Sequence, residues 1–443
     1  MSGIAKLLLN RGSKVSGSDV KISPITQELQ DLGAEIFIGH RPENIQGADV
    51  LVYSSAIKES NPEIIAAGKK QLPILKRAQA LADLMKEKIV ITVAGSHGKT
   101  TTTSLVSYLL LEAGLFPTVA IGGILKNIDT NAYFGKGNFF VAEADESDGS
   151  FLYYRPKYSI VTNIDREHLD YYKSFQNELN AFREFLEQTE DGGCVFCCSD
   201  DENLKTMLKG YKKRHLLFGL KPGADIYAKN IEMKGLSCRF DCFLKDKFVD
   251  SFQLALGGEH NVSNSLAVIA LGLELGIDLR FIKKTLAGYK GARRRLEIKF
   301  SDRGIMVIDD YAHHPTEIRA ALGAVKNLKH DKLIAVFQPH RYTRTKLLLN
   351  EFAASFNLAD YIILTDIYPA SEQPIEGVDA KVLLGLIKKQ APGAHVVYLP
   401  KEEIAAHLLT VLKPNTIVLA LGAGDIIKVS DELVERLKGQ DDS

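Results

Sequence analysis

The sequence predicts an α/β protein of three domains, from its length, its alternating elements and one phosphate-binding motif. At 443 residues the chain is long enough for about three domains with a core each. In its last third, short apolar runs alternate with helical segments, which is typical of a parallel, doubly wound sheet. Near residue 95 a strand, a glycine turn and a helix follow one another directly. We expect domain ranges of 1–87, 88–297 and 298–443.

The composition excludes several classes of function. Lys plus Arg and Asp plus Glu both number 55, so the formal net charge is zero. Nucleic acids and anionic membranes are bound through a basic excess that this chain lacks. No apolar run reaches the ~20 residues that span a bilayer, and the apolar stretch after Met1 is too short for an export signal. We therefore expect a cytoplasmic protein without a nucleic-acid or membrane partner.

The first domain has a Rossmann-like pattern of helices and strands. Helices are expected over 3–10 and 25–31, and strands over 14–17 and 48–53. Asp19 follows the strand end Val15-Ser16-Gly17-Ser18, where dinucleotide-binding folds place an acid for a ribose. Such a fold should begin with a strand and a glycine-rich turn, yet this chain starts in what reads as the helix after them. We therefore predict an N-terminal domain that lacks its first strand, with a start codon assigned too late.

The phosphate motif runs from Gly95 to Thr101, with the sequence Gly-Ser-His-Gly-Lys-Thr-Thr. An apolar strand over 89–93 precedes it, and an apolar repeat at helical spacing follows. Backbone amides and the helix dipole bind phosphate at such a turn, and Lys99 reaches the terminal phosphates. Thr100 stands where a Mg²⁺ ligand belongs. The usual motif has a glycine where this chain has Val93, and an ordinary strand–turn–helix is the alternative.

Two further strand ends carry acids. A strand over 138–143 ends in the acidic block Glu143 to Asp148, and a strand over 158–164 leads to an acidic segment that contains His168. Oxygen ligands beside a phosphate loop suit Mg²⁺. A histidine in that place is positioned for a metal ion or a phosphate. The alternatives are a solvated acidic loop and a structural histidine.

A helix that opens near residue 259 carries Asn261 and Asn264 on one face, because the two are three residues apart. Paired amides can hydrogen-bond an adenine edge, whereas helix capping is the plain alternative. The block ends in three arginines at 293–295, which suit either a solvated surface or a polyphosphate.

In the last domain the sequence predicts strands over 304–308, 333–337, 361–364, 395–399 and 417–421, and helices over 343–356 and 401–412. Two loops at strand ends gather unusual chemistry: 309–317 contains Asp310 and His313, and 338–345 contains His340, Arg341 and Arg344. Loops at the carboxyl edge of a parallel sheet form the usual ligand crevice. Histidines and arginines there can hold a carboxylate and a phosphate together.

The five cysteines lie in two apolar segments, 194–198 and 238–242. Their spacing is compatible with zinc. Because 194–198 reads as a buried strand, we predict structural thiols; a disulfide is disfavoured in a reducing compartment.

With these residues in view, the chain resembles the Mur ligases over essentially its whole length. The resemblance rests on six blocks in the right order: Gly-Ser-His-Gly-Lys-Thr-Thr-Thr-Thr, Glu-Ala-Asp-Glu-Ser-Asp, Thr-Asn-Ile-Asp-x-Glu-His-Leu-Asp, His-Asn-Val-x-Asn, Asp-Asp-Tyr-Ala-His-His-Pro-Thr-Glu-Ile and Phe-Gln-Pro-His-Arg-Tyr-Thr-Arg-Thr.

The resemblance implies a UDP-binding Rossmann-like domain, a central P-loop ATPase and a C-terminal Rossmann-like domain. The member it resembles most uses ATP with Mg²⁺ (Mn²⁺ possible) to phosphorylate the carboxylate of UDP-N-acetylmuramate. The amine of L-alanine then displaces the phosphate, in peptidoglycan synthesis. A monomer or weak homodimer is expected, and closure of the domains around the three substrates.

The resemblance also assigns residues. Gly95, Ser96, His97, Gly98, Lys99, Thr100 and Thr101 match ATP-phosphate contacts, and Thr100, Glu143 and His168 match metal ligands. Asn261 and Asn264 match adenine contacts, Arg295 a phosphate contact and Asp310 a ribose contact. His313, His340, Arg341 and Arg344 match the amino-acid region. Asp19, Ser54 and Ser55 match the UDP site, with weaker support.

Three alternatives stay open. A related ligase recycles murein tripeptide and usually has a tyrosine where Ser147 stands. A P-loop motor or switch protein would leave the C-terminal histidines and arginines without a purpose, and loss of the first strand could leave an inactive binding protein. Sister ligases carry a carbamylated lysine downstream of the metal histidine, but Asn180 to Arg183 offers none.

Overall fold

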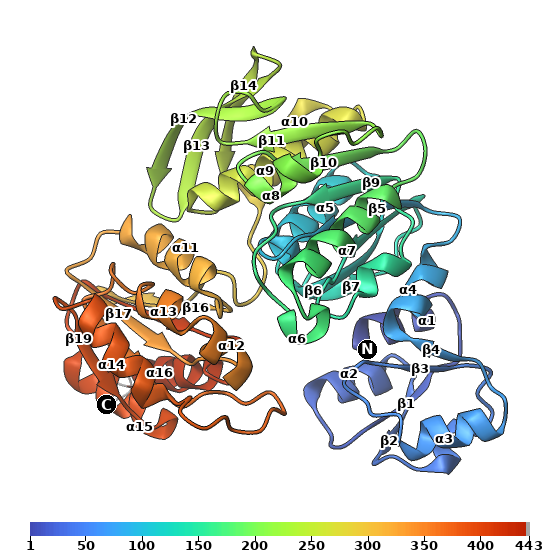
Figure 1. The fold of residues 1–443 in the computed structure, drawn as a ribbon, viewed down its shortest axis with the longest axis horizontal. Helices are drawn as coiled ribbons and strands as arrows, with labels where there is room; N and C mark the ends of the chain where they lie inside the picture. The colour runs from blue at the N-terminus through green and yellow to red at the C-terminus, as the bar shows by residue number, and fades with distance from the viewer. Residues whose placement is uncertain (440–443) are drawn as a thin grey trace. The chain divides into compact units, whose positions relative to one another are not determined.

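The computed structural model describes residues 1–439 (Figure 1). The chain divides into two compact units. Unit 1 consists of residues 1–229, 242–250 and 263–289, and unit 2 consists of 230–241, 251–262 and, within the described residues, 290–439. The α/β fold class predicted from the sequence is confirmed. In residues 1–439 every helix is too short or too polar to cross a membrane.

The N-terminal part of unit 1 contains two parallel strand pairs. β1 pairs with β2 and β3 with β4, in two separate sheets. Ser23 caps α2, and Pro24 occupies the first turn, where no amide donor is needed. The predicted helices are confirmed, while both predicted strands begin two to three residues later than expected. The elements are α1 Ser2–Asn10, β1 Ser16–Asp19, α2 Pro24–Asp31, β2 Glu35–Ile38, η1 Pro42–Ile45, β3 Leu51–Tyr53, α3 Pro62–Lys69, β4 Ile74–Lys76 and α4 Arg77–Met85.

A ten-stranded sheet follows, in the order β14-β13-β12-β11-β10-β9-β5-β8-β6-β7. β5 is parallel to both of its neighbours, β8 and β9, and only its first residue is exposed. The elements are β5 Ile89–Ala94, α5 Lys99–Glu112, β6 Thr118–Leu125, β7 Thr130–Tyr133, β8 Phe139–Glu143, η2 Ser150–Tyr153, β9 Tyr158–Val161, α6 Leu169–Tyr172, α7 Phe175–Glu187, β10 Cys194–Cys198, α8 Glu202–Met207, β11 His215–Gly219, β12 Ile226–Lys234, β13 Ser237–Leu244, β14 Lys247–Leu254, α9 Glu259–Glu274 and α10 Leu279–Gly288.

This strand order positions the site. Because β8, β5 and β9 are parallel neighbours, the segments after them meet at one edge of the sheet. These are the segments in which the sequence places the phosphate loop, the acidic block and His168.

All five cysteines are free and buried. β10 spans Cys194–Cys198 as predicted, with every residue buried. Burial raises the pKa of the Cys194 and Cys238 thiols to about 11 and that of Cys242 to about 12. Such thiols are protonated at neutral pH and behave as small hydrophobic groups.

Unit 2 is built on a six-stranded sheet in the order β15-β16-β20-β17-β18-β19, parallel except for β15. Separate hydrophobic clusters cover its two faces, as a doubly wound sheet requires. The elements are β15 Glu297–Asp302, β16 Ile305–Asp310, α11 Pro315–Lys326, β17 Lys332–Phe337, α12 Tyr342–Leu347, α13 Leu349–Ala353, β18 Tyr361–Leu364, α14 Ala380–Gln390, β19 His395–Tyr398, α15 Lys401–Val411, β20 Thr416–Leu421 and α16 Ile427–Gly439.

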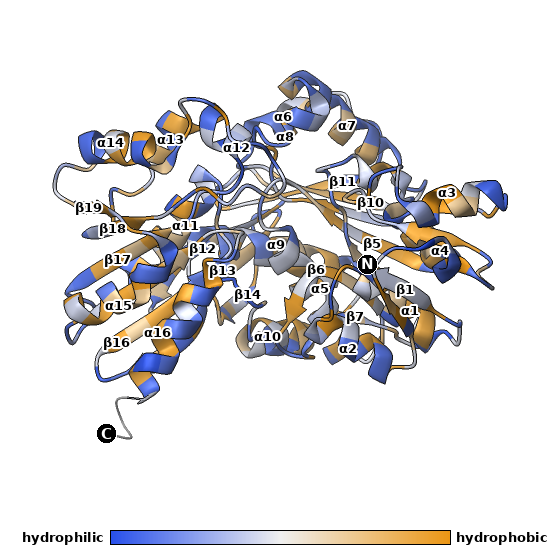
Figure 2. Ribbon diagram, turned by 90° about the horizontal axis from the view of Figure 1, so that it is seen from below, coloured by the Kyte–Doolittle hydropathy of each residue, from blue (hydrophilic) through white to orange (hydrophobic). Residues whose placement is uncertain are grey.

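Three strand ends meet where the chain order of this sheet reverses. β20 lies between β16 and β17, so Asp310, Leu421 and Phe337 are aligned side by side. The helix predicted over 343–356 is instead two helices, because the backbone leaves helical geometry at Leu348. Figure 2 shows mostly hydrophobic strands here, and helices with one hydrophilic face.

Candidate active site

The phosphate loop is held in place by the residues that follow β9. Asn163 accepts a hydrogen bond from the Ser96 amide on its backbone oxygen (3.0 Å) and one from the His97 amide on its side-chain oxygen (2.8 Å). Thr162 donates its hydroxyl hydrogen to the His97 carbonyl (2.6 Å). These contacts fix the turn before any ligand arrives. Within residues 1–439 the amides of Gly98 to Thr101 donate to no protein acceptor, as is normal for a first helical turn.

Lys99 begins α5 and turns its ammonium group back over the loop. Nζ donates to the carbonyl oxygens of Gly95 (2.6 Å) and Ser96 (3.1 Å) and to the Glu146 carboxylate (2.7 Å). Burial alone would lower the pKa of Lys99, but the carboxylates of Glu146 and Asp145 outweigh it and raise that pKa. The lysine is therefore a fixed positive charge at the predicted phosphate site.

Thr100 and Glu143 contact each other, as a shared metal site requires. The Thr100 hydroxyl lies 3.1 and 3.0 Å from the two carboxylate oxygens of Glu143, and the Gly122 amide donates to the same carboxylate (2.9 Å). Burial raises the pKa of Glu143, while Lys99 and these hydrogen bonds act against the increase. β8 ends at Glu143, which explains why the side chain points at the loop after β5.

His168 joins a second group of acids that the sequence analysis did not single out. His168 Nε2 lies 3.5 Å from an oxygen of Glu146 and 3.5 Å from an oxygen of Glu167. One ligand atom from each of the three lies within 4.8 Å of the others. Glu146 is fully buried, and its Oε2 has no hydrogen-bond partner within residues 1–439. An orphaned buried carboxylate oxygen fits a bound cation.

Glu178 on α7 is another acid, close enough to Glu146 and Glu167 for their charges to act on it. It is fully buried, and the pKa of its carboxyl is raised to about 9, first by burial and then by the charges of Glu146 and Glu167. A signal for it was present in the sequence. Phe182, Phe185 and Leu186 follow it at helical spacing, so an acid stands on an otherwise apolar helix face.

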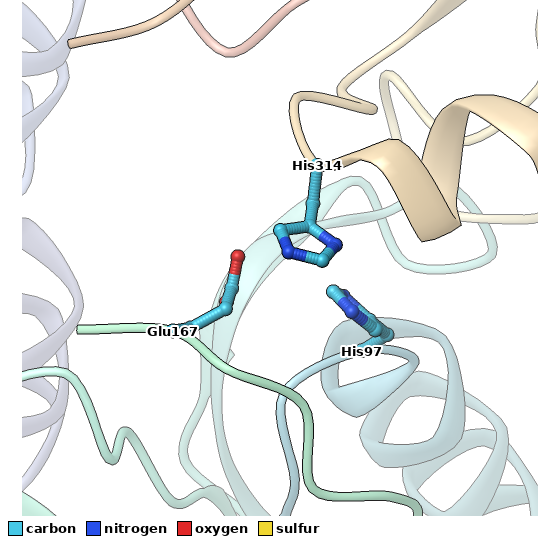
Figure 3. A group of neighbouring side chains, drawn as sticks. All are labelled: His97, Glu167 and His314. Carbon is cyan, nitrogen blue, oxygen red and sulfur yellow. The ribbon is translucent and has the colours of Figure 1, made fainter. Parts of the chain in front are cut away.

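His97 lies in the turn that leads into α5, and Glu167 on the segment after β9 (Figure 3). His97 Nε2 lies 3.1 Å from the carboxylate of Asp165. The backbone amide of Asp165 in turn donates to Ser96 Oγ (2.8 Å). The phosphate loop is thus tied to the segment after β9 at both Ser96 and His97.

The two asparagines of α9 point to different surroundings. Asn261 donates from Nδ2 to the Gly257 carbonyl (2.7 Å), which anchors the start of the helix. The Asn264 amide packs against Gly98, where an added Cβ would lie 2.8 Å from Oδ1. Asn264 therefore adjoins the phosphate loop.

In unit 2, Asp310 is buried at the end of β16. Its two oxygens accept hydrogen bonds from the amides of Leu296 (2.7 Å) and Ala312 (2.8 Å). Burial raises the pKa of Asp310 to about 6, although Arg295 and these hydrogen bonds oppose the increase. Arg295 Nη1 lies 3.6 Å from the Glu317 carboxylate. Asp310 and Arg295 therefore belong to one connected network.

The residues of unit 2 that are expected to bind the amino-acid substrate lie close together. The rings of His313 and His340 meet edge to face with centroids 5.8 Å apart. Arg344 donates to His340 Nδ1 (3.3 Å), and Arg341 contacts Glu372 (3.9 Å). Burial and the charges of His313, Arg344 and Arg341 lower the pKa of His340 to about 3. At neutral pH His340 is uncharged, and its Nε2 carries the hydrogen because Nδ1 accepts.

The residues matched to the UDP site lie at the ends of two N-terminal strands. Asp19 ends β1 and accepts from the Val20 amide (2.7 Å), whereas Ser54 and Ser55 directly follow β3. Beside them lies a polar group that the sequence did not suggest. Ser18 donates to Glu63 (2.8 Å) and lies 2.9 Å from His40 Nδ1.

Comparison with known protein families defines the class of protein. Residues 1–89 match the Mur ligase family catalytic domain, 93–272 the Mur ligase middle domain, and 294–424 the Mur ligase glutamate ligase domain. These three matches cover most of the chain. The chain belongs to the Mur ligase family, which confirms the resemblance inferred from its motifs.

Within that family, the chain is similar to proteins of one particular name. It is 46% identical to the UDP-N-acetylmuramate–L-alanine ligase of Geobacter sp. (strain M21), over 100% of this chain and 96% of the relative. The ligase of that name from Geotalea uraniireducens (strain Rf4) is also 46% identical, over 99% and 96%.

Solved structures agree. The UDP-N-acetylmuramate–alanine ligase of Thermotoga maritima superposes with a TM-score of 0.83 at 30% identity, over 99% of this chain and 97% of the other. The murein peptide ligase of Psychrobacter arcticus, at a TM-score of 0.71 and 24% identity over 99% and 96%, shows the shared fold alone.

Proposed function

We propose that this protein is an ATP-dependent ligase that joins L-alanine to the carboxylate of UDP-N-acetylmuramate in peptidoglycan synthesis. Relatives of that name, similar over the whole chain, support the choice of substrates. The structural observation that carries the proposal is Lys99 at the start of α5, partly buried, held over a preformed phosphate loop and paired with a buried acid that follows β8.

The reaction has two steps. A carboxylate oxygen of UDP-N-acetylmuramate attacks the γ-phosphorus of ATP, and the bond to the β-phosphate oxygen breaks to release ADP. The amine nitrogen of L-alanine then attacks the acyl carbon, phosphate leaves, and the nitrogen loses a proton. The first step needs neutralisation of charge more than covalent help. Lys99 and the available amides of Gly98 to Thr101 supply it.

Magnesium ions fit two groups of residues. Thr100 and Glu143 would hold one ion, and Glu146, Glu167 and His168 the other, since a buried carboxylate oxygen without a partner belongs to the second group. When bound, Mg²⁺ neutralises phosphate charge; Mn²⁺ could replace it. The segment from 180 to 183 offers no lysine for carbamylation.

The remaining residues bind the substrates. Asn261 and Asn264 contact adenine, Arg295 a phosphate and Asp310 the ribose. His313, His340, Arg341 and Arg344 hold the amino acid, whose carboxylate suits guanidinium groups. Asp19, Ser54 and Ser55 contact UDP.

We further propose domains over 1–87, 88–297 and 298–443, a cytoplasmic location, and a monomer or weak homodimer without a nucleic-acid or membrane partner. The chemistry requires groups of both units to reach the same acyl carbon, so the substrates bind with domain closure.

One assay tests the function. ADP release is measured with UDP-N-acetylmuramate and, in turn, L-alanine, glycine, L-serine or murein tripeptide. We expect turnover that needs both substrates and is fastest with L-alanine. Preference for the tripeptide would instead identify the recycling ligase, and turnover without either substrate would identify a P-loop ATPase of another kind.

A further inference from the structure

Arg294 of unit 2 makes an unusual number of directed contacts for a residue without a role in the reaction. Nε donates to the buried Asp309 carboxylate (3.1 Å), Nη2 to the Gly422 carbonyl (2.6 Å) and Nη1 to the Gly424 carbonyl (3.3 Å). Its backbone φ is +59°, a left-handed conformation that non-glycine residues rarely adopt. The surrounding structure therefore holds Arg294 in one geometry.

The same guanidinium group is next to one end of a series of rings, which we call the aromatic row: Tyr311, His313, His340 and Tyr368. Arg294 lies over the Tyr311 ring, with Cζ 5.0 Å from its centroid. Tyr311 meets His313 at 5.3 Å, and His313 meets His340 at 5.8 Å. His340 stacks on Tyr368 at 5.5 Å and an interplanar angle of 8°.

The far end of the row returns to Arg294 through Gly424. A Cβ placed on Gly424 would lie 2.6 Å from Cγ of Tyr368 and 2.5 Å from Oε1 of Gln338, so only glycine fits against this ring. The Gly424 carbonyl accepts from Arg294. Arg294 is thus next to the row at both ends, through the ring of Tyr311 and through the glycine that packs on Tyr368.

We propose that Arg294 is a positioning residue. Its contacts at both ends of the aromatic row keep the rings packed together, so that His313 and His340 keep the orientation in which they bind the incoming amino acid. This proposal rests on the proposed function for the identity of the ligand, but the geometry of the row can be tested without turnover.

Arginine is needed because the three acceptors lie in different directions. A guanidinium group offers five N–H donors in a planar fork and a face for the Tyr311 ring. A lysine ammonium group keeps the charge but lacks the planar fork. Loss of the fork frees the loop from Gly422 to Gly424, and Tyr368 and His340 then lose their support.

The experiment compares Arg294→Met and Arg294→Lys with the wild type and with Arg436→Met, a control that removes an exposed arginine of α16. Imidazole signals are recorded by NMR on the full chain with histidine labelled, and are assigned with His313→Gln and His340→Gln. His395 and His407, which pack on Tyr361, serve as internal controls.

Both Arg294 variants should move the His313 and His340 signals and leave those of His395 and His407 in place. Gly424→Ala, which pushes on Tyr368 from the other side, should move the His340 signal as well. In turnover assays the Arg294 variants should raise KM for L-alanine about tenfold or more and leave KM for ATP within about twofold.

Unchanged His313 and His340 signals in the folded Arg294→Met protein would overturn the proposal. If that variant fails to fold, Arg294→Lys decides, because wild-type signals and a wild-type KM for L-alanine would show that the fork is not needed. A wild type inactive with L-alanine would contradict the proposed function instead, while the NMR comparison would still test Arg294.

Discussion

Glu146→Gln tests a residue that the sequence analysis placed in an acidic, magnesium-binding block but did not single out. The substitution keeps the shape of the side chain and removes its charge. In the native protein Glu146 is fully buried and accepts from Lys99 Nζ at 2.7 Å, while Lys99 is 15% exposed. The negative charge of the Glu146 carboxylate is therefore compensated mainly by Lys99.

The magnitude follows from what remains after the change. Removing one partner of a buried ion pair costs about 3–5 kcal/mol, but glutamine still accepts a hydrogen bond, and Lys99 keeps the carbonyls of Gly95 and Ser96. Relief of repulsion by Glu178 adds little at pH 7, because that carboxyl has a pKa of about 9 and is protonated. We expect unfolding to become easier by about 2–3 kcal/mol.

Nucleotide binding should change in a characteristic way. Without Mg²⁺, ATP competes with Glu146 for Lys99, so Glu146→Gln should bind ATP more tightly in EDTA. With Mg²⁺ the variant lacks a proposed ligand, and its affinity should gain less from the ion than that of the wild type. Urea unfolding and calorimetric titration with and without Mg²⁺ measure the two effects.

Glu202→Gln is the matched control, because it removes the charge from a Lys–Glu pair of similar length (2.8 Å) on the surface of the same unit. It should change neither quantity measurably. An unfolding midpoint for Glu146→Gln equal to that of the wild type would refute the ion-pair reasoning. An unchanged response to Mg²⁺ would refute the role of Glu146 as a cation ligand.

Three further predictions concern the loop and unit 2. Lys99→Ala should lower turnover about 10³-fold with an unchanged circular dichroism spectrum; near-normal turnover would mean that the phosphate loop is misassigned. Gly95→Ala places a Cβ 2.2 Å from Thr162 Oγ1 at φ +129° and should destabilise the fold clearly more than Gly12→Ala, which has φ +92° and open space; equal thermal unfolding of the two would contradict the steric argument. The pKa of His340 is lowered to about 3. Below pH 6.5 the unfolded state therefore binds a proton that the native state does not bind, and the free energy of unfolding decreases as the pH is lowered. Between pH 6.5 and 5 the wild type should lose about 1.6 kcal/mol more than His340→Gln in urea unfolding, and parallel losses would show that His340 does not stay neutral.

Local features were predictable from the sequence and long-range ones were not. The phosphate loop lies in seven consecutive residues, and strands such as β10 and β18 match the prediction residue for residue because each is a short, buried apolar run. The insertion of β20 between β16 and β17 has no local signal, since it depends on which strands pair across the chain. The same holds for Arg294, whose partners lie 15 to 130 residues away.

Glu146 shows why some site residues escape a reading of motifs. It stands three residues beyond Glu143, in a block already marked as acidic, and nothing in that block distinguishes the acid that pairs with Lys99 from its neighbours. The distinction arises only when the turn after β8 buries Glu146 beside α5. Glu178 differs, because a carboxyl on an apolar helix face is visible in the sequence.

The glycine missing from the phosphate motif also has a structural explanation. Val93 is fully buried within β5 and is aligned with Glu143 on β8 and Ile160 on β9, so it belongs to the sheet and not to the turn. The turn itself uses Gly95 at φ +129° and Gly98 at φ +82°, conformations that side chains oppose. Since Gly95 already provides the sharp bend and Gly98 directs the helix amides outward, a glycine at position 93 would only weaken the strand. The phosphate site thus depends on two positive-φ glycines and the open amides after them, and not on the full length of the usual motif.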